Sequence, residues 1–520
     1  MAADAELEID LSPDRDRRRG AAGEDTDNGG ADSVVGTVRR QASKGFRWTL
    51  AGQMASKIGS LAMNLVLARL LLPADFGVYA IALSAVTFLM MVDDIGIIAA
   101  ATQWQGEFKS IVPTASIIAL ASSTLFFGIA FVGAPAFAAL AGSQSATPLL
   151  RLVTTAILID GVIAVRTASL LRTFKQNCLV VAHLCGVVAQ LGVGISLAVA
   201  GRGPLSLAAA YVASYLVMGV CILWFAKLPF TFSFDRAIAK RLLRFGLPLA
   251  ASLGAEAVLL NTDYVIVGRA LGATAVGLYL LAFNVSSWAP GVILNALRWV
   301  AMPSFSQLSE DKDAFSYGVQ RSVVLLVTFM LPVTVVITVL APTLVVFLYG
   351  DVWAPAAGVL QFLAVLGVVR LVTSLTADVL SGAGKTFAAL WVHIGWAVAL
   401  IPALIIGTHL GGIRGTGIAH VAVGAGIAVP LAMVALRRVG VPLLPIARAL
   451  LRPLLAGALA ALVCAGVAWA LDASAFMQLA VAGTAAPITY VLTAFPLDQV
   501  RRWADRAGAL VASRAHLHRV

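Results

Sequence analysis

Charged residues are scarce in this chain: they make up 12% of its 520 residues, whereas hydrophobic residues make up 60%. Soluble globular proteins carry charge on about a quarter of their residues, so this composition excludes a soluble fold and indicates a polytopic membrane protein. The net charge of +11 would suggest nucleic acid as a partner of a soluble protein. In a membrane protein its meaning depends on where the charges lie along the membrane, and we expect no nucleic-acid partner.

Cysteine is scarce as well. Cys178, Cys185, Cys221 and Cys464 lie in or beside apolar segments without metal-type spacing, which favours neither a disulfide framework nor a zinc site. The sequence contains no Ser/His/Asp or Cys/His arrangement that suggests covalent catalysis, and the P-loop-like letters at 382–386 follow no predicted strand. We therefore predict no cofactor, no metal site and no enzymatic activity.

The first 44 residues mix acids and bases and contain no apolar run. They lack the apolar core of a signal peptide, which predicts a disordered cytoplasmic tail. Apolar segments fill most of the rest, each with about the 20 residues that a spanning helix needs, so we predict an all-α membrane protein with about 14 transmembrane helices. The predicted spans are 46–68, 76–101, 111–133, 149–172, 178–200, 204–226, 246–270, 274–302, 319–341, 356–381, 387–407, 415–436, 453–471 and 475–496.

These spans divide the chain into parts. Basic and apolar residues alternate in two cytoplasmic segments, a pattern typical of helices that lie along the inner membrane surface. The predicted parts are the tail 1–44, an N-terminal six-helix bundle 45–227, an amphipathic linker 228–244, a C-terminal six-helix bundle 245–437, two additional spans at 438–496 and an amphipathic cytoplasmic tail 497–520.

The distribution of Lys and Arg predicts the orientation. With the N-terminus placed in the cytoplasm, few of the 37 Lys and Arg residues fall on external segments, as the positive-inside rule requires. Those few are Arg69, Arg151, Arg202, Arg269 and Arg414. Both termini are therefore predicted to be cytoplasmic.

The chain contains an internal repeat. The segment at 66–83 reads VLARLLLPADFGVYAIAL, and the segment at 266–283, which aligns with it without gaps, reads IVGRALGATAVGLYLLAF. Both copies occupy the external turn between the first two helices of a six-helix set. Such parallel repeats are typical of alternating-access transporters that hold substrate between the two halves. The coinciding positions include Arg69/Arg269, Leu71/Leu271, Gly77/Gly277, Tyr79/Tyr279 and Ala82/Ala282.

Longer segments carry a family resemblance. The first half contains GFRWTLAGQ, LARLLLPADFGVYAIA and VDDIGIIAAATQ, and the second contains RFGLPLAASLGAEAVLLNTDYVIVGRALGATAVGLYLLAFN. Across approximately 40–500 the chain resembles polysaccharide transporters, the Wzx-like flippase branch of the multidrug/oligosaccharidyl-lipid/polysaccharide exporter superfamily. The external turn motif LxPxDFG, which includes Pro73, Asp75 and Gly77 with Arg69 just before it, is more typical of this branch than of the drug exporters.

The resemblance implies two pseudo-symmetric six-helix bundles around a central cavity, plus two C-terminal helices. It implies that undecaprenyl-diphosphate-linked oligosaccharide, a polysaccharide precursor, is moved from the cytoplasmic to the outer leaflet of the bacterial inner membrane by alternating access. Partners implied in the same way are this lipid-linked oligosaccharide, membrane lipids, and polysaccharide polymerase or glycosyltransferase machinery.

One polar face interrupts the first span. Gln53, Lys57, Ser60 and Asn64 follow one another at helical steps of four, three and four, so they share a face. A lysine facing lipid near mid-membrane costs roughly 2.5–3.5 kcal/mol, so this face is predicted to look into protein or a water-filled cavity. Lys57 is our candidate for contact with a diphosphate, and the alternative is an ion pair with an acid across the bundle.

The seventh span carries an acidic counterpart. Ser252, Glu256 and Asp263 share a face. We hypothesise that the basic and acidic faces look into the same cavity and that Glu256 or Asp263 titrates or binds a cation; the alternative is a static ion pair. On the tenth span Arg370 and Asp378 share a face and could neutralise each other.

The eighth span presents a third polar face. Asn284, Trp288, Asn295 and Arg298 lie on it. An aromatic ring flanked by amides suits a sugar, and a guanidinium suits phosphate. The alternatives are ordinary packing for Trp288, which is favoured, and snorkelling to the interface for Arg298.

Adjacent acids and isolated histidines are two further sets of polar residues in the predicted spans. Asp93 and Asp94 point about 100° apart on a helix, which argues against a joint metal site and favours a cap or ion pair at the inner gate. His393 and His420 are isolated in the sequence and favour core positions over roles as ligands or proton carriers.

The sequence therefore favours a flippase for lipid-linked glycans. A cation-coupled drug exporter of the same superfamily is the first alternative, and it needs an apolar or anionic cavity. A membrane glycan polymerase or ligase is the second; it requires a large external loop with catalytic groups, whereas the predicted connections are short.

Overall fold

The computed structural model describes residues 52, 54–93, 96–104, 106–308, 312–383, 385–471 and 474–495, with several side chains between 248 and 260 and those at 294–308 outside the description. The described chain is helical almost throughout and contains no strand. The predicted tails 1–44 and 497–520 lie outside the described residues.

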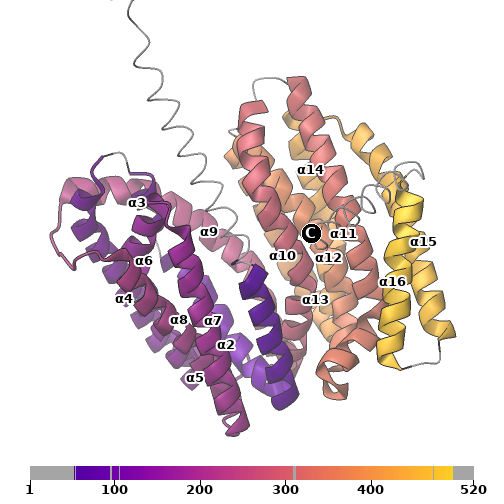
Figure 1. Ribbon diagram of the computed structural model, residues 1–520, viewed down its shortest axis with the longest axis horizontal. Helices are drawn as coiled ribbons and strands as arrows, with labels where there is room; N and C mark the ends of the chain where they lie inside the picture. Colours follow the sequence, from indigo (N-terminus) through magenta and orange to yellow (C-terminus); the bar gives the residue numbers. More distant parts are fainter. Residues whose placement is uncertain are drawn as a thin grey trace, which may run out of the picture.

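The first bundle is formed by the first half of the chain (Figure 1, indigo to magenta). Gly96, at a φ of 63°, separates α2 from α3, so the predicted span 76–101 is interrupted near its end. The helices are an unlabelled helix at 54–70, α2 (Pro73–Asp93), α3 (Ile97–Thr102), α4 (Phe108–Leu140), α5 (Ala146–Val153), α6 (Thr155–Arg172), α7 (Gln176–Val199) and α8 (Pro204–Ala226).

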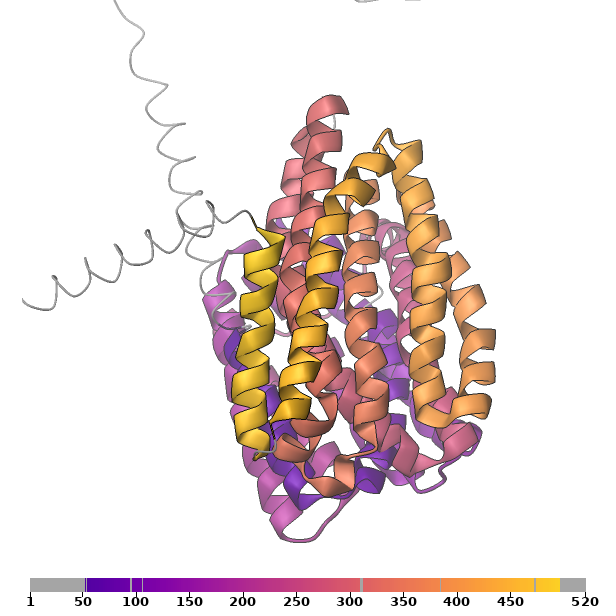
Figure 2. The same ribbon diagram turned by 90° about the vertical axis from the view of Figure 1, so that its right-hand side faces the viewer.

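The second bundle lies beside the first (Figure 1, pink to orange). The last two helices, in yellow, pack against its outer side, where Tyr490 of α16 donates a hydrogen bond to the Thr328 carbonyl of α11 (Figure 2). The helices are α9 (Arg236–Leu271), α10 (Ala273–Leu308), α11 (Lys312–Tyr349), η1 (Asp351–Trp353), α12 (Ala356–Gly382), α13 (Thr386–Val423), η2 (Gly424–Ala428), α14 (Val429–Arg438), α15 (Leu443–Ala470) and α16 (Ala475–Ala494).

Helix α9 joins the two bundles. The Asp235 carboxylate caps its start by accepting hydrogen bonds from the backbone of Ala237 and Ile238, at 2.7 and 3.2 Å. The basic segment predicted as a surface linker forms its first turns, with Ala239 and Leu242 buried in one apolar cluster with residues of α3, α4 and α6. The helix then continues without a break into the predicted seventh span.

The number of spans agrees with an all-α fold of about 14 transmembrane helices. Eleven described helical segments are long and apolar enough to cross a membrane. One of them, Phe387–Arg438, contains two predicted spans, because the backbone leaves helical geometry at Gly411 and Gly412 and the two arms fold back on each other. The helix at 54–70 and the second part of α9 correspond to the two remaining predicted spans.

One apolar cluster crosses from bundle to bundle. It contains Leu67, Phe76 and Ile81 of the first and Tyr279 and Trp353 of the second. Most of these side chains lie toward one end of the molecule, where the turns after residues 70, 140, 271 and 349 also lie. We call this the gate end; it is the end that the charge distribution predicts to be external.

Candidate functional site

The two copies of the sequence repeat meet at the gate end. A Cβ atom added to Gly77 of α2 would overlap the carbonyl oxygen of Ala273, and one added to Gly277 of α10 would overlap that of Pro73. Only glycine permits such a close approach of two helix backbones. The glycines at equivalent repeat positions therefore form a symmetric crossing, which we call the glycine crossing.

The equivalent arginines of the repeat each reach into the opposite bundle. Arg69 donates hydrogen bonds to the Leu348 and Phe347 carbonyls at the end of α11, at 2.9 and 2.6 Å. Arg269 donates to the Leu140 carbonyl at the end of α4, at 3.5 Å. The last carbonyls of a helix lack intrahelical partners and carry partial negative charge, so they attract guanidinium groups. We call these two contacts the arginine latches.

A tryptophan closes the same region. The indole Nε1 of Trp353 donates to the Ala68 carbonyl at 2.9 Å, and its ring meets Phe76 edge-on at 5.1 Å between centroids. Trp353 is 1% exposed. The turn between α11 and α12 is thereby packed against the first bundle, and the structure is closed at the gate end.

The external turn motif shapes the start of α2. Pro73 is its first residue, where a missing N–H costs nothing. Asp75 accepts a hydrogen bond from the Leu72 backbone N–H at 3.0 Å, which is one half of a capping box. The motif residues therefore fix the helix that carries Gly77 into the crossing.

A cavity of about 280 Å³ lies between the helix at 54–70 and helices α10 and α12. Lys57 lines it from the first bundle and Arg370 from the second, together with the hydroxyl groups of Ser287 and Ser374. The Arg370 guanidinium lies 5.2 Å from the centre of the Phe283 ring. Two cations and several hydroxyl groups between the bundles suit an anionic ligand rich in hydroxyl groups.

A smaller chamber of about 50 Å³ shares Arg370, Phe283 and Ser374 with this cavity. Its other wall includes Asp263, which is 1% exposed, and His420. The Tyr279 hydroxyl donates to Asp263 Oδ2 at 2.7 Å, and His420 Nε2 lies 3.1 Å from that hydroxyl and 3.5 Å from Asp263 Oδ2. A buried carboxylate beside an imidazole and a phenol is a group that can exchange a proton or hold a cation.

Only part of the predicted basic face lines the cavity, and the described residues of the predicted aromatic face do not line it. On the first, Lys57 lines the cavity, whereas Ser60 and Asn64 are half-buried and do not. Asn284 is exposed and Trp288 is 36% exposed, so the wall is formed by their neighbours on α10. The remaining members, namely Gln53 and the side chains of Asn295 and Arg298, lie outside the described residues.

The predicted acids are also separated. Asp263 lies in the small chamber next to Arg370, and the side chain of Glu256 lies outside the described residues. Asp93 is buried in the first bundle, where its Oδ2 accepts a hydrogen bond from Ser123 of α4 at 2.9 Å. Asp94 lies outside the described residues.

Sequence reasoning missed His420 as a partner of the acidic face. It is buried, as expected for a core residue, but it contacts the Asp263 and Tyr279 pair. Tyr279 and His420 are 141 residues apart in the chain, and no local pattern connects them.

Two pseudo-symmetric helical bundles that enclose a cavity and close at one end are the architecture of alternating-access transporters. Within that class the chain belongs to the polysaccharide biosynthesis protein family, which it matches over residues 66–358. The predicted fold class and the predicted polysaccharide branch are both confirmed.

Similar proteins have names that agree with this family. The succinoglycan biosynthesis transport protein ExoT of Rhizobium meliloti (strain 1021) is 28% identical over 68% of this chain and 72% of its own length. The lipid II flippase MurJ, in an inward closed conformation, superposes with a TM-score of 0.73 at 15% identity, over 86% of this chain and 97% of that one.

A multidrug resistance MATE family transporter in an inward-facing conformation also superposes, with a TM-score of 0.60 at 18% identity, over 74% of this chain and 94% of that one. The fold is therefore shared by a lipid flippase and a drug transporter. Family membership, not the fold, separates these alternatives.

Proposed function

We propose that this chain flips undecaprenyl-diphosphate-linked oligosaccharide from the cytoplasmic to the outer leaflet by rocking its two bundles. The observation that carries the proposal is the cavity that brings Lys57 of one bundle and Arg370 of the other to the same space. Membership of the polysaccharide biosynthesis protein family supports it.

The chemistry of such a substrate matches the cavity. Its polyprenyl tail is stable in lipid, whereas its diphosphate and sugars need a polar and cationic route across the hydrocarbon layer. Lys57 and Arg370 supply positive charge to the diphosphate, and the hydroxyls of Ser287 and Ser374 supply hydrogen bonds to sugar. No chemical bond changes in this process, so the protein acts as a transporter rather than an enzyme.

The gate end supplies the moving part. Release to the outer leaflet requires the glycine crossing, the arginine latches and the Trp353 contact to separate, since all of them join the bundles. The closed gate corresponds to the state that accepts substrate from the opposite side. In this cycle Asp263 and its partners respond to a proton or cation, and Glu256 stays a second candidate for that role.

We place the protein in the bacterial inner membrane with both termini in the cytoplasm. The arginines predicted to be external lie near the gate-end turns of the described chain, which supports this orientation. Polysaccharide polymerase and glycosyltransferase machinery are the protein partners that this role implies.

The alternatives fit the structure less well. An exporter of cationic drugs is disfavoured by the polar cavity between the bundles, to which each bundle contributes a cation. A polymerase or ligase needs a large external domain, whereas the described gate-end turns span only a few residues, such as 200–203 and 272.

The proposal is tested with labelled lipid-linked oligosaccharide in proteoliposomes. Lys57→Gln removes one cation and should lower the flipping rate about tenfold or more, because a charge-assisted contact contributes about 1.5–3 kcal/mol. Lys57→Arg keeps the charge and is the matched control. Equal rates for Lys57→Gln and the native protein would refute the proposed role of the cavity, and transport of a small cationic dye in place of the glycolipid would favour the drug exporter.

A further inference from the structure

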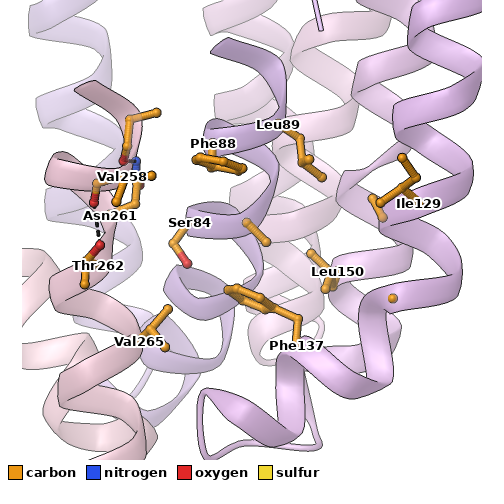
Figure 3. Close-up of a pocket in the computed structure, with 14 residues that line it drawn as sticks. Ser84, Phe88, Leu89, Ile129, Phe137, Leu150, Val258, Asn261, Thr262 and Val265 are labelled. Carbon is orange, nitrogen blue, oxygen red and sulfur yellow. Dashed lines mark hydrogen bonds between the residues drawn. The ribbon is translucent and has the colours of Figure 1, made fainter. Parts of the chain in front are cut away.

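A second cavity, of about 340 Å³, opens between the bundles at another place. It shares no lining residue with the cationic cavity among the described residues. Figure 3 shows Phe88 of α2 between two walls, with Ile129 and Phe137 of α4 on one side and Val258 and Val265 of α9 on the other. We call it the side pocket.

The side pocket is lined mainly by the carbon atoms of apolar side chains. Each of its few polar side chains donates a hydrogen bond within its own helix: Ser84 to the Ile81 carbonyl, Asn261 to the Ala257 carbonyl, and Thr262 to the Val258 carbonyl. A cavity with such a predominantly apolar lining holds water poorly and accepts hydrocarbon instead. The side pocket therefore calls for an apolar occupant.

The side pocket begins near the gate end and extends beyond the middle of the membrane. Phe137 is about 5 Å along α4 from its gate-end terminus and Leu89 about 24 Å along α2 from its own, at 1.5 Å per residue. The hydrocarbon layer is about 30 Å thick, so the pocket runs from near its surface to beyond its middle. Ile129 and Val258 in its walls are 53% and 39% exposed, so the pocket is accessible from outside the molecule.

One cation stands at the gate-end side of the side pocket. Arg269 is exposed and lies one turn beyond the lining residue Val265. Its hydrogen bond to the Leu140 carbonyl, at 3.5 Å, uses only one of its five N–H groups. The guanidinium of Arg151 instead lies over the ring of Phe131, 4.9 Å from its centre, and Phe131 does not line the pocket. An occupant with a hydrocarbon chain and an anionic head group complements the pocket and Arg269 together.

We propose that the side pocket binds one acyl chain of an anionic membrane phospholipid, with its phosphate beside Arg269, and that this lipid stabilises the closed gate. An apolar cavity of about 150 Å³ accepts benzene, so 340 Å³ accommodates on the order of ten carbon atoms of a chain. A resident phospholipid fits better than the transported lipid, because the pocket is separate from the cationic cavity.

The effect on the gate follows from the position of the side pocket. Helices α4 and α9 touch beyond it at the gate end, through the Arg269 latch and the contact of Gly142 with Gly268. The bound acyl chain contacts both α4 and α9 only while these two helices remain together. A ligand that prefers one state shifts the equilibrium toward that state, so the lipid favours the closed gate.

Gly133 of α4 offers a clean test. It lines the side pocket, and a Cβ atom there would meet nothing within 4 Å, so the side chain of Gly133→Phe begins in open space and extends into the pocket. Gly128 of the same helix has equally open surroundings but does not line the pocket, which makes Gly128→Phe the matched control. The probe is phosphatidylglycerol with a diazirine in one acyl chain, in phosphatidylcholine nanodiscs.

In the native protein and in Gly128→Phe, we expect saturable cross-links to peptides from α4 and α9. Gly133→Phe should reduce them about tenfold or more. Arg269→Gln should remove the preference over a diazirine phosphatidylcholine, whereas Arg151→Gln should keep it. Distances between spin labels at Gln144 and Val352 should shorten as phosphatidylglycerol is added, except in Gly133→Phe. Equal cross-linking in both glycine variants, or displacement of the probe by substoichiometric undecaprenyl phosphate, would overturn the proposal; neither readout requires flipping.

Discussion

At the scale of single residues, the most informative group is the Asp263 carboxylate. It is 1% exposed, and its closest partners are the Tyr279 hydroxyl and the His420 imidazole. A carboxylate buried in a transmembrane bundle is costly and marks an ion or proton pathway by default. Its chamber borders the cationic cavity through Arg370, so the proposed coupling role requires a change in its charge state to alter the wall that contains Arg370.

Asp263→Asn is expected to abolish stimulation of flipping by a proton or sodium gradient. The amide still accepts the hydrogen bond from Tyr279 but can neither be ionised nor offer a cation a negative charge, and the loss of stability should be about 1–3 kcal/mol. The measurement is the flipping rate in proteoliposomes with and without each gradient.

Asp93→Asn is the matched control for this substitution. Asp93 is equally buried, but it is bonded to Ser123 inside the first bundle. Gradient stimulation should survive in this variant. If it survives in Asp263→Asn and disappears in Asp93→Asn, the coupling group lies in the first bundle instead.

At the scale of helices, the glycine crossing of α2 and α10 decides how closely the bundles approach. Substitution of Gly77 by Leu places carbon atoms against the backbone of Ala273, and overpacking of this kind costs about 1–3 kcal/mol. This cost destabilises only the closed state. The ratio of open to closed molecules should therefore rise about five- to 150-fold. Spin labels at Gln144 and Val352, exposed gate-end positions in opposite bundles, would report a longer distance.

Gly192→Leu is the control for Gly77→Leu. Gly192 lies within α7, and a Cβ atom there would meet nothing within 4 Å. The substitution changes the same residue type inside a helix and should leave the distance distribution unaltered. A distance in Gly77→Leu that matches the native one would show that the crossing tolerates side chains and does not set the gate.

The positions of most helices could be predicted from the sequence, whereas the contacts between helices could not. Hydrophobic length predicted the spans, and the repeat predicted that Gly77 and Gly277 occupy equivalent turns. It did not predict that these turns touch, because contact between distant segments depends on how the bundles pack. The start of α9 was likewise assigned to a surface linker, although Leu242 packs against the first bundle. His420 shows the same limit, since its partner Tyr279 is far away in the chain.

At the scale of the whole molecule, the repeat produces reciprocal contacts, in which each bundle extends an arginine to the other. The first bundle extends Arg69 to the end of α11, and the second extends Arg269 to the end of α4. Each latch therefore holds one bundle by a helix terminus of the other. Such pseudo-symmetric contacts can be lost together when the bundles rock, which suits a transition between two discrete states.

Removal of both latches should shift the transporter toward the open gate. Hydrogen bonds from a charged donor contribute about 1.5–3 kcal/mol each when partly shielded from water, so Arg69→Gln should increase the open fraction about tenfold or more. Arg269→Gln should act less strongly, because its contact is longer, at 3.5 Å against 2.6 and 2.9 Å. The double variant should exceed either single one in the Gln144–Val352 distance measurement. Arg202→Gln removes an exposed positive charge from the same end and serves as the control. Equal shifts in Arg202→Gln and Arg69→Gln would mean that surface charge, rather than the contact between bundles, governs the gate.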